Sequence, residues 1–290
     1  MLRVFIEYQP FPFPLAPGEK IQPNCWQILL MSAVFAIFVY PLLYKLGRAG
    51  RANEKIRDYV PMTIGLILIG TEIYKQILML YHFNWKYHFY LFPFQLCSVP
   101  MYTAALIPVI KNQKLKDSLF SFMAFYGMIG GLSVMIYQKS VLTWEDYSLN
   151  WHSIFWHLSL IALGIFSASY LRIGSGSFNR NAKILSYGSI VFVICVILAE
   201  IMNFMIVMNK GYNEYTSGGN LFYISMFMYN LDIPILKIVI SHCGWYIGLI
   251  GYTSVLLLGG LVLSLLYMGF NRLNKAITNK FQLKSIKTNN

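Results

Sequence analysis

The class of this protein is evident from residues 184–208, ILSYGSIVFVICVILAEIMNFMIVM, in which Glu200 and Asn203 are the strongly polar side chains. A helix that crosses a bilayer needs about 20 consecutive, mostly apolar residues, and this stretch satisfies that length. The whole chain agrees with it, since 57% of the 290 residues are hydrophobic and 12% are charged. Soluble chains carry roughly twice that charged fraction, so several membrane spans are expected. A disordered chain and a disulfide scaffold are excluded by the same composition.

Seven stretches reach the length of a membrane span, and we predict a helix in each: Cys25–Tyr44, Tyr59–Tyr81, Tyr90–Ile110, Leu119–Tyr137, Trp151–Leu171, Ile184–Met208 and Trp245–Phe270. The predicted fold is therefore an all-α, polytopic membrane helix bundle that forms one domain over residues 1–290, with its bundle at 25–270.

Three segments outside these spans have their own predicted roles. Residues 1–24 are interrupted by five prolines and lack the apolar core of a signal peptide, so they form an outer N-terminal segment. Residues 221–240 are apolar but contain Asp232 and Pro234, which favours a re-entrant or interfacial segment on the outer side over an eighth span. Residues 271–290 form a basic tail.

The distribution of Lys and Arg predicts the orientation. Counted loop by loop, 16 fall on the side of the first connection and of the C-terminal tail, and 6 on the other side. Cytoplasmic loops collect Lys and Arg, so the N-terminus is expected outside and the C-terminus in the cytoplasm, in a multi-pass protein of the cell membrane. The net charge of +12 is spread over four inner segments, and we therefore expect no nucleic-acid partner.

Polar side chains inside the spans are few, and charged ones cost about 2.5–3.5 kcal/mol each at the centre of a helix. They are Glu72, Lys75, Gln95, Cys97, His152, His157, Glu200 and Asn203. With the predicted orientation, Glu72 lies roughly 13 Å, Cys97 roughly 10 Å and His157 roughly 9 Å below the outer boundary. If their helices face one another, these side chains line one cavity open to the outer leaflet.

Each of these residues also has a purely structural interpretation. Glu72 and Lys75 are three residues apart and can neutralise each other. A lone Cys in an apolar helix is usually inert, which is the interpretation for Cys25, Cys195 and Cys243, although Cys25 and Cys243 both fall near the outer face, where a pairing stays open. A lone His157 is more often an interhelical hydrogen-bonding group than a catalytic one.

The combination of these residues points further than its members do. A thiol nucleophile needs a base, an orienting group and an oxyanion donor. Cys97, His157, the Glu72 carboxylate and the amides of Gln95 and Asn203 would supply them at matching depth. Metal binding is not expected, since His152 and His157 are five apart, about 140° round a helix, and no further ligand follows at a suitable spacing. No cofactor is expected.

Six blocks of the sequence resemble the YwaF-like family of integral membrane proteins. Residues 90–98, YLFPFQLCS, are similar to its LPLxLCS signature, and the block HSIFWH at 152–157 is similar to an H-x4-H block. Further similar blocks follow in order along residues 25–270: GTEIYKQ at 70–76, YGMIGG at 126–131, SGGNLFY at 217–223 and GWYI at 244–247. The chain departs from the family in a longer connection between Asn203 and Asn220 and in Gly244, which stands where the family has a Pro within WPWYI.

The family resemblance implies a chemistry, since distant animal relatives include a membrane phospholipid acyltransferase that works through a Cys and a His. It implies that Cys97 accepts the acyl chain and that His157, or else His152, is the general base, with Glu72 assisting. Gln95, Asn203, Asn220 and Tyr223 would provide oxyanion or substrate-binding groups. Membrane lipids would be the partners.

Two other functions remain open at this stage. The same outward pocket would suit a noncatalytic binding, transport or sensor protein, in which Glu72 and Lys75 hold a zwitterion or a proton. Because the sequence has no nucleotide-binding loop, an energised transporter would need an ATPase or another membrane partner. A purely structural membrane protein is the third possibility.

Overall fold

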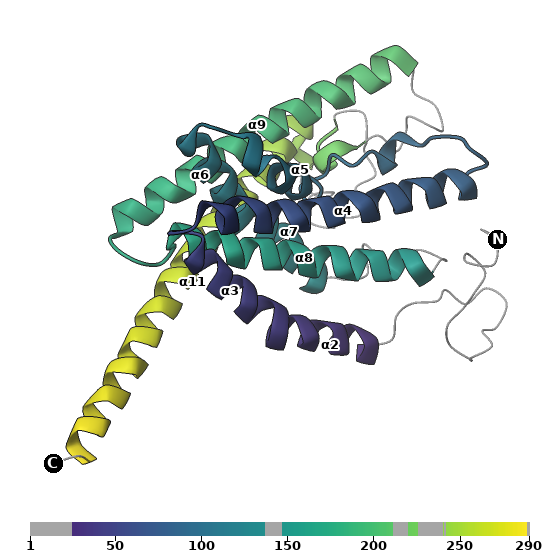
Figure 1. Ribbon diagram of the computed structural model, residues 1–290. Helices are drawn as coiled ribbons and strands as arrows, with labels where there is room; N and C mark the ends of the chain where they lie inside the picture. Colours follow the sequence, from purple (N-terminus) through teal and green to yellow (C-terminus); the bar gives the residue numbers. More distant parts are fainter. Residues whose placement is uncertain (1–24, 137–146, 211–219, 226–239, 241, 289–290) are drawn as a thin grey trace.

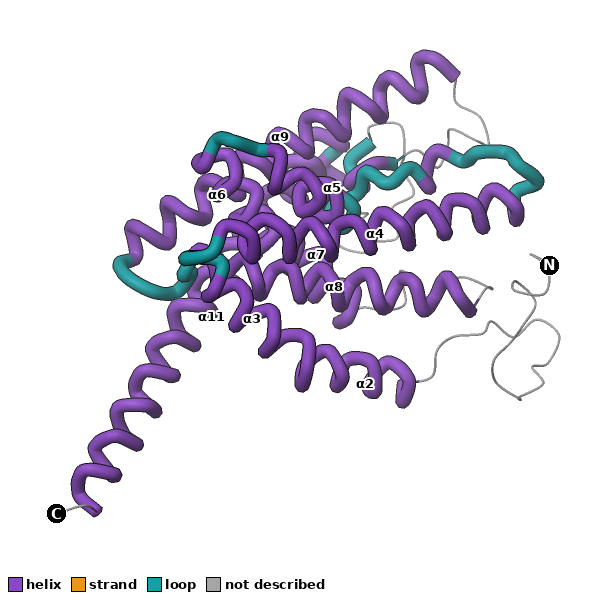
Figure 2. The backbone as a smooth tube through the Cα atoms, viewed as in Figure 1, coloured by secondary structure: helices purple, strands orange, loops and turns teal. Residues whose placement is uncertain are grey.

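The computed structural model describes residues 25–136, 147–210, 220–225, 240 and 242–288, and the regular elements within these ranges are all helical (Figure 1, Figure 2). Within the same ranges, six helices are long and apolar enough to cross a membrane: Trp26–Ala49, Glu54–His82, Gln113–Ile136, Ser148–Leu171, Phe178–Met208 and Trp245–Leu273. The prediction of an all-α bundle of apolar spans is confirmed at this level.

Two of the six spans are interrupted by π-helical turns. The first span joins α2 (Cys25–Val34) to α3 (Tyr40–Ala49) through such a turn at Phe35–Val39. The third joins α6 (Gln113–Phe122) to α7 (Met128–Ile136) through a second turn at Met123–Gly127, a feature often found near functional sites. The other long helices are α4 (Glu54–His82), α8 (Tyr147–Leu171), α9 (Phe178–Lys210) and α11 (Trp245–Thr288).

Helices α4 and α6 start at the same end of the bundle. Each begins after an asparagine whose side chain caps the first turn, Asn53 for α4 and Asn112 for α6. An ion pair of 2.7 Å joins Asp58, in the second turn of α4, to Lys116 in the first turn of α6. The two helices therefore run in the same direction, and the chain between them must return along the bundle.

The returning chain follows α4 closely. The side-chain amide of Gln76 donates a 2.7 Å hydrogen bond to the Leu91 carbonyl. Further back, a Cβ added at Gly65 of α4 would lie 2.6 Å from the Ala105 nitrogen, so Gly65 allows the two backbones to meet. This segment passes the length of α4 before α6 begins (Figure 1).

The same segment differs from the continuous helix predicted for Tyr90–Ile110. It consists of a 3-10 turn (Phe89–Leu91), the short helix α5 (Val99–Leu106) and a second 3-10 turn (Ile107–Val109). Pro93 and Pro108 lack the N–H that a helix interior needs, whereas Pro100 stands in the first turn of α5, where no such bond is lost. Pro93 and Pro108 thus favour the breaks in this segment, although α4 accommodates Pro61 in its interior.

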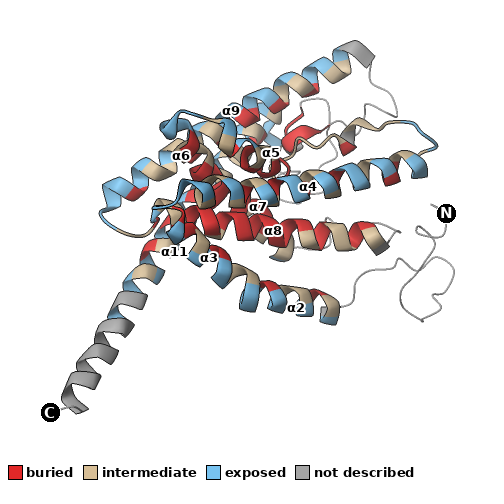
Figure 3. Cartoon of the chain, viewed as in Figure 1, coloured by how far each residue is buried: buried red, intermediate tan, exposed pale blue. Residues whose placement is uncertain are grey.

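The core lies around α8. In its most apolar window 78% of the residues are buried, against 17% in the first span and 11% in α11 (Figure 3). Helices α9 and α11 instead expose large apolar side chains, including Ile190, Ile197, Leu258 and Leu266. Such apolar surface suits helices that face lipid.

The C-terminal end of α8 is held by two arginines. The Arg51 guanidinium donates to the carbonyls of Ser169 and Tyr170, and that of Arg180 donates to the Leu171 carbonyl at 2.7 Å. The last carbonyls of a helix have no partner within it, and cations at this end also complement the helix dipole. These contacts fix the axial position of the helix that carries His152 and His157.

Some predicted segments are covered only partly. Residues 1–24 lie outside the described ranges, and of the segment 221–240 the structure describes 221–225 and Ile240. The first three of these residues form a 3-10 turn inside the bundle, where Leu221 and Phe222 are fully buried. Cys243 is a free thiol, and the side chain of Cys25 is outside the described part. The basic tail continues α11 as a helix to Thr288.

Candidate functional site

Cys97 stands at the end of the non-helical part of the returning segment. Ser98 caps α5, so the thiol precedes the N-terminus of this helix by one residue. The Ser98 side chain and the N–H of Cys97 itself both lie near the sulfur. Partial positive charge at a helix N-terminus stabilises an anion placed there. The helix N-terminus thus favours the ionised form of the thiol, whereas the burial of Cys97 opposes it.

Helix α8 is attached directly to the Cys97 backbone. The indole Nε1–H of Trp156 donates a 3.0 Å hydrogen bond to the Cys97 carbonyl oxygen. The next residue along α8 is His157, which is almost fully buried. The turn of α8 that carries His157 is thus held against the backbone of the candidate nucleophile.

The hydrogen bond of His157 defines its tautomer. Nδ1 lies 2.6 Å from the Ser153 carbonyl oxygen, and because a carbonyl can only accept, Nδ1 carries the proton. Nε2 is then the basic nitrogen, and this buried atom has no hydrogen-bond partner. His157 is therefore oriented as a neutral base, although the Cys97 thiol does not donate to it in this structure.

Two consecutive glycines of α7 separate the thiol from the His157 backbone. A Cβ added at Gly130 would lie 3.7 Å from the Cys97 Cβ, which is ordinary contact. A Cβ added at Gly131 would lie 2.7 Å from the His157 carbonyl oxygen, which is too close. Gly131 thus permits α7 and α8 to meet at this level, and Cys97 and His157 contact neighbouring residues of one helix.

Glu72 and Lys75 form the ion pair that their spacing predicts. The Lys75 ammonium lies 2.7 Å from Glu72 Oε1, which also accepts a 2.6 Å hydrogen bond from Gln76. The second carboxylate oxygen, Oε2, is buried and has no hydrogen-bond partner. The Lys75 ammonium is also close enough to interact electrostatically with Cys97, His152 and His157. Lys75 is thus the ion-pair partner of Glu72, and Cys97, His152 and His157 lie in the wider surroundings of its ammonium.

His152 belongs to the same cluster but is placed differently from His157. It lies near the Thr71 backbone, one residue from Glu72, and its ring lies 5.3 Å from that of Trp156. Its Nε2 is also buried without a partner. His152 therefore connects α8 to α4, and Trp156 connects α8 to Cys97.

Gln95, Asn203 and Asn220 meet in a second group, which holds residues 220–225. The Gln95 amide donates to the Asn220 carbonyl at 3.1 Å and accepts from the Phe222 N–H at 2.7 Å. Asn203 accepts from the Leu221 N–H at 2.9 Å and donates to the Leu221 carbonyl at 3.2 Å. That these amides bind substrate or an oxyanion stays a prediction. In this structure they are hydrogen-bonded to backbone groups of residues 220–222.

The buried turn contains a strained residue. Phe222 has a φ of 59°, a left-handed conformation that a bulky residue rarely adopts. The Gln95 bond to its N–H and its ring contact with Phe94, at 5.8 Å, hold it there. The Asn220 side chain accepts from the Ser225 N–H at 2.8 Å and closes the turn. The Tyr223 side chain lies outside the described part.

Three contributors to the site escaped the sequence prediction. Ser98 follows the Cys in the YLFPFQLCS block, and Trp156 precedes His157 in HSIFWH, so both stood within the blocks that were noticed. Lys75 was predicted as a partner of Glu72, either neutralising it or holding a ligand with it, and not as a neighbour of Cys97 and the two histidines. Its position near Cys97, His152 and His157 depends on the packing of α4 against α8 and the returning segment, which spacing within α4 does not reveal.

The family of the chain follows from one comparison. A model of the TMEM164 family matches residues 21–271, which include every site residue described above. The chain belongs to the TMEM164 family. Together with the six apolar helices, membership in the TMEM164 family identifies a multi-pass membrane protein. Searches of curated proteins and of solved structures give no match.

A metal centre is not favoured by the side chains in the described ranges. They contain no group of three or more His, Cys, Asp or Glu residues placed to hold a metal ion. The cluster instead combines a thiol, two imidazoles with free nitrogens, and one ion pair. This set of groups is suited to nucleophilic and acid–base chemistry.

Proposed function

We propose that this member of the TMEM164 family is a lipid acyltransferase that carries the acyl chain as a thioester on Cys97, with His157 as general base. The observation that supports it most is the tautomer of His157: the Ser153 carbonyl holds the Nδ1 proton, and Nε2 is buried, basic and unpartnered. A hydrogen bond from the adjacent Trp156 fixes the Cys97 backbone beside this turn. The YwaF-like blocks and their acyltransferase relatives favour the same chemistry.

The first half-reaction transfers an acyl chain to the enzyme. His157 Nε2 accepts the thiol proton, and the Cys97 sulfur attacks the ester carbonyl carbon of a phospholipid. The C–O bond of the ester breaks, and the leaving lysolipid alkoxide takes the proton from His157. The products are a Cys97 thioester and a lysolipid.

The second half-reaction reverses these roles. The hydroxyl of an acceptor lipid gives its proton to His157 and its oxygen attacks the thioester carbonyl. The C–S bond breaks, and the thiolate recovers the proton from His157. The Ser98 hydroxyl and the N–H of Cys97, which are near the sulfur, are the donors placed to stabilise the charge that develops. Neither half-reaction requires a cofactor.

The proposal includes a topology of seven passes, six of them helical and one formed by the broken segment at 89–109. It is supported by the common direction of α4 and α6, which requires the intervening chain to cross back. The 16 to 6 distribution of Lys and Arg then favours an outer N-terminus and a cytoplasmic C-terminus in the cell membrane. With this orientation the Cys97 cluster lies in the outer half, within reach of outer-leaflet lipids.

A transfer assay tests the proposed reaction. The purified protein is reconstituted in phosphatidylcholine vesicles with a labelled lysolipid, and acylation of that lysolipid is followed. Cys97→Ser and His157→Gln should each abolish transfer, whereas Cys195→Ser, a matched change at a buried free thiol of α9, should leave it intact. Equal transfer by the Cys97→Ser variant would refute the mechanism.

A noncatalytic binding protein is the second candidate, and one observation favours it. Glu72 Oε2 is buried without a partner although the other oxygen is paired with Lys75, so the carboxylate has an unused acceptor. A cationic or hydroxylated ligand would satisfy it, and such intramembrane charges often mark transport pathways. On this account Glu72→Gln abolishes ligand binding while Cys97→Ser does not, and an ATPase or other membrane partner would drive transport.

A further inference from the structure

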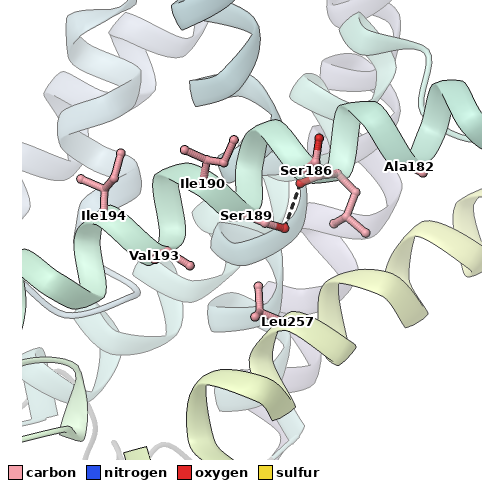
Figure 4. A pocket seen from close by; sticks show the side chains of 8 residues that line it. Ala182, Ser186, Ser189, Ile190, Val193, Ile194 and Leu257 are labelled. Carbon is pink, nitrogen blue, oxygen red and sulfur yellow. Dashed lines mark hydrogen bonds between the residues drawn. The ribbon is translucent and has the colours of Figure 1, made fainter. Parts of the chain in front are cut away.

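A groove lies between α9 and α11, and none of its lining residues belongs to the Cys97 cluster (Figure 4). The groove has a volume of about 530 Å³. Figure 4 shows Ile190, Val193 and Ile194 along α9 and Leu257 on α11. The remaining lining residues are Ala182, Leu185, Ser186 and Ser189.

The groove does not communicate with the Cys97 cluster. The hydroxyl of Ser189, which lines the groove, lies 2.7 Å from the hydroxyl of the buried Tyr126. Behind them, the ring of Tyr126 is stacked on that of Phe192 at 4.5 Å, and Phe192 contacts Phe222 at 6.5 Å. These buried rings fill the interior between the groove and the segment before Cys97. The groove is therefore a separate site rather than an entrance to the first.

The dimensions of the groove match one leaflet of a bilayer. Its lining on α9 runs from Ala182 to Ile194, which at ~1.5 Å per residue is a length of about 18 Å. The hydrocarbon core is ~30 Å thick, so one leaflet contributes about 15 Å. The surface around the groove is apolar, with Ile190, Val193 and Ile194 all exposed. In a membrane, an apolar groove of this length is in contact with the acyl chains of lipids.

The near end of the groove provides cations for a headgroup. Residues 172–183, which lead into α9, contain Arg172, Arg180 and Lys183 and no acidic residue. Lys183 is exposed, lies one residue from the groove at Ala182, and has no ion pair with any described residue. The loop is held to α11 by a 2.7 Å hydrogen bond from Asn271 to Ser175. Cationic side chains therefore stand where a lipid phosphate would lie.

We propose that the groove between α9 and α11 binds one anionic glycerophospholipid, with an acyl chain along Ile190, Val193 and Leu257 and its phosphate at Lys183. Apolar length and charge complementarity are the two observations that select this occupant over a neutral lipid or a second copy of the chain. The site lies at the basic end of the bundle, so it goes beyond the proposed acyl transfer and does not depend on it.

Photolabelling tests the site with two lipids that differ in the headgroup. The full chain is reconstituted in phosphatidylcholine vesicles containing a trace of either phosphatidylglycerol or phosphatidylcholine with a diazirine on one acyl chain, and labelled peptides are mapped. The phosphatidylglycerol probe should label 185–194 and 251–260 more strongly than the phosphatidylcholine probe. Lys183→Gln should lower that preference by about fivefold, and Lys114→Gln, at the same end on α6, should not.

Filling the groove provides the second arm of the experiment. Val193→Trp should abolish labelling, while Leu198→Trp, which replaces another exposed α9 side chain outside the groove, should leave it unchanged. If Val193→Trp does not fold, Ile190→Trp serves the same purpose. Equal labelling by both probes, or by both tryptophan variants, would overturn the proposal, as would crosslinks between two copies of the chain at these residues. The Cys97→Ser variant should be labelled as strongly as the wild-type chain, because the groove does not depend on acyl transfer. The two proposals can therefore fail independently.

Discussion

The indole of Trp156 donates a 3.0 Å hydrogen bond to the carbonyl oxygen of Cys97, and this bond joins the core helix α8 to a segment with no regular structure. Replacing Trp156 with Phe keeps most of the apolar volume but leaves a carbonyl unpaired. We expect a stability loss of about 1–3 kcal/mol together with slower acyl transfer. Trp26→Phe is the control, because Trp26 is 76% exposed and distant from the site. Unchanged transfer by a folded Trp156→Phe variant would contradict a positioning role.

The adjacent glycines of α7 should respond oppositely to alanine. Gly131→Ala places a Cβ 2.7 Å from the His157 carbonyl and should destabilise by roughly 1–3 kcal/mol. Gly130→Ala meets Cys97 only at 3.7 Å, and a helix prefers Ala to Gly, so this change should be neutral or stabilise by up to about 1 kcal/mol. Thermal unfolding in detergent compares them. The reverse order of stability would mean that α7 and α8 are packed differently.

Removing only one partner of the Glu72–Lys75 ion pair should cost more stability than replacing both partners. Lys75→Met leaves a buried carboxylate without its cation and should destabilise by roughly 1–3 kcal/mol, less than the ~3–5 kcal/mol of a fully buried pair because Lys75 keeps some exposure and Gln76 still donates to Glu72. Adding Glu72→Gln should restore most of this loss. A double-mutant cycle on unfolding free energies measures the coupling, and additive effects would refute it.

Gln95 should control the buried turn at residues 220–225. Gln95→Leu removes the acceptor of the Phe222 N–H and the donor to Asn220, so the strained turn loses what holds it. Hydrogen exchange of the Leu221 and Phe222 amides should accelerate while that of α8 is unchanged. Gln113→Leu, at the start of α6, is the matched control. Unaltered exchange at Phe222 would show that packing alone maintains the turn.

The sequence predicts the fold correctly where a span is one long, continuous apolar helix. The run at 184–208 forms the middle of α9, and the predicted spans on α4, α8 and α11 agree with helices of the structure. The break in the segment at 89–109 was also readable in principle, because Pro93 and Pro108 are unfavourable in a helix interior, although α4 accommodates Pro61. Apolar length alone does not reveal this break, because a non-helical segment buried among other helices is as apolar as a membrane-spanning helix.

The candidate residues were chosen from the sequence alone. Their hydrogen bonds and neighbours could not be predicted in the same way. Apolar length and charge distribution predict that these residues lie at similar depth, but they do not predict that Lys75 lies near Cys97, His152 and His157. They do not predict the role of Gln95 either, because its partners Asn220 and Phe222 are more than a hundred residues away in the chain. Likewise, the tautomer of His157 depends on a hydrogen bond from Nδ1 to the Ser153 carbonyl one turn earlier. The sequence does not predict that hydrogen bond.

The most direct test of the central claim is the mass of the intact protein after incubation with phosphatidylcholine vesicles and no acceptor. The account predicts an added mass of one acyl chain that hydroxylamine removes, present in the wild-type chain and in Cys195→Ser and absent from Cys97→Ser. His157→Gln should form the adduct more slowly, since Nε2 no longer takes the thiol proton. An unmodified wild-type chain, or an equal adduct on Cys97→Ser, would contradict the thioester mechanism.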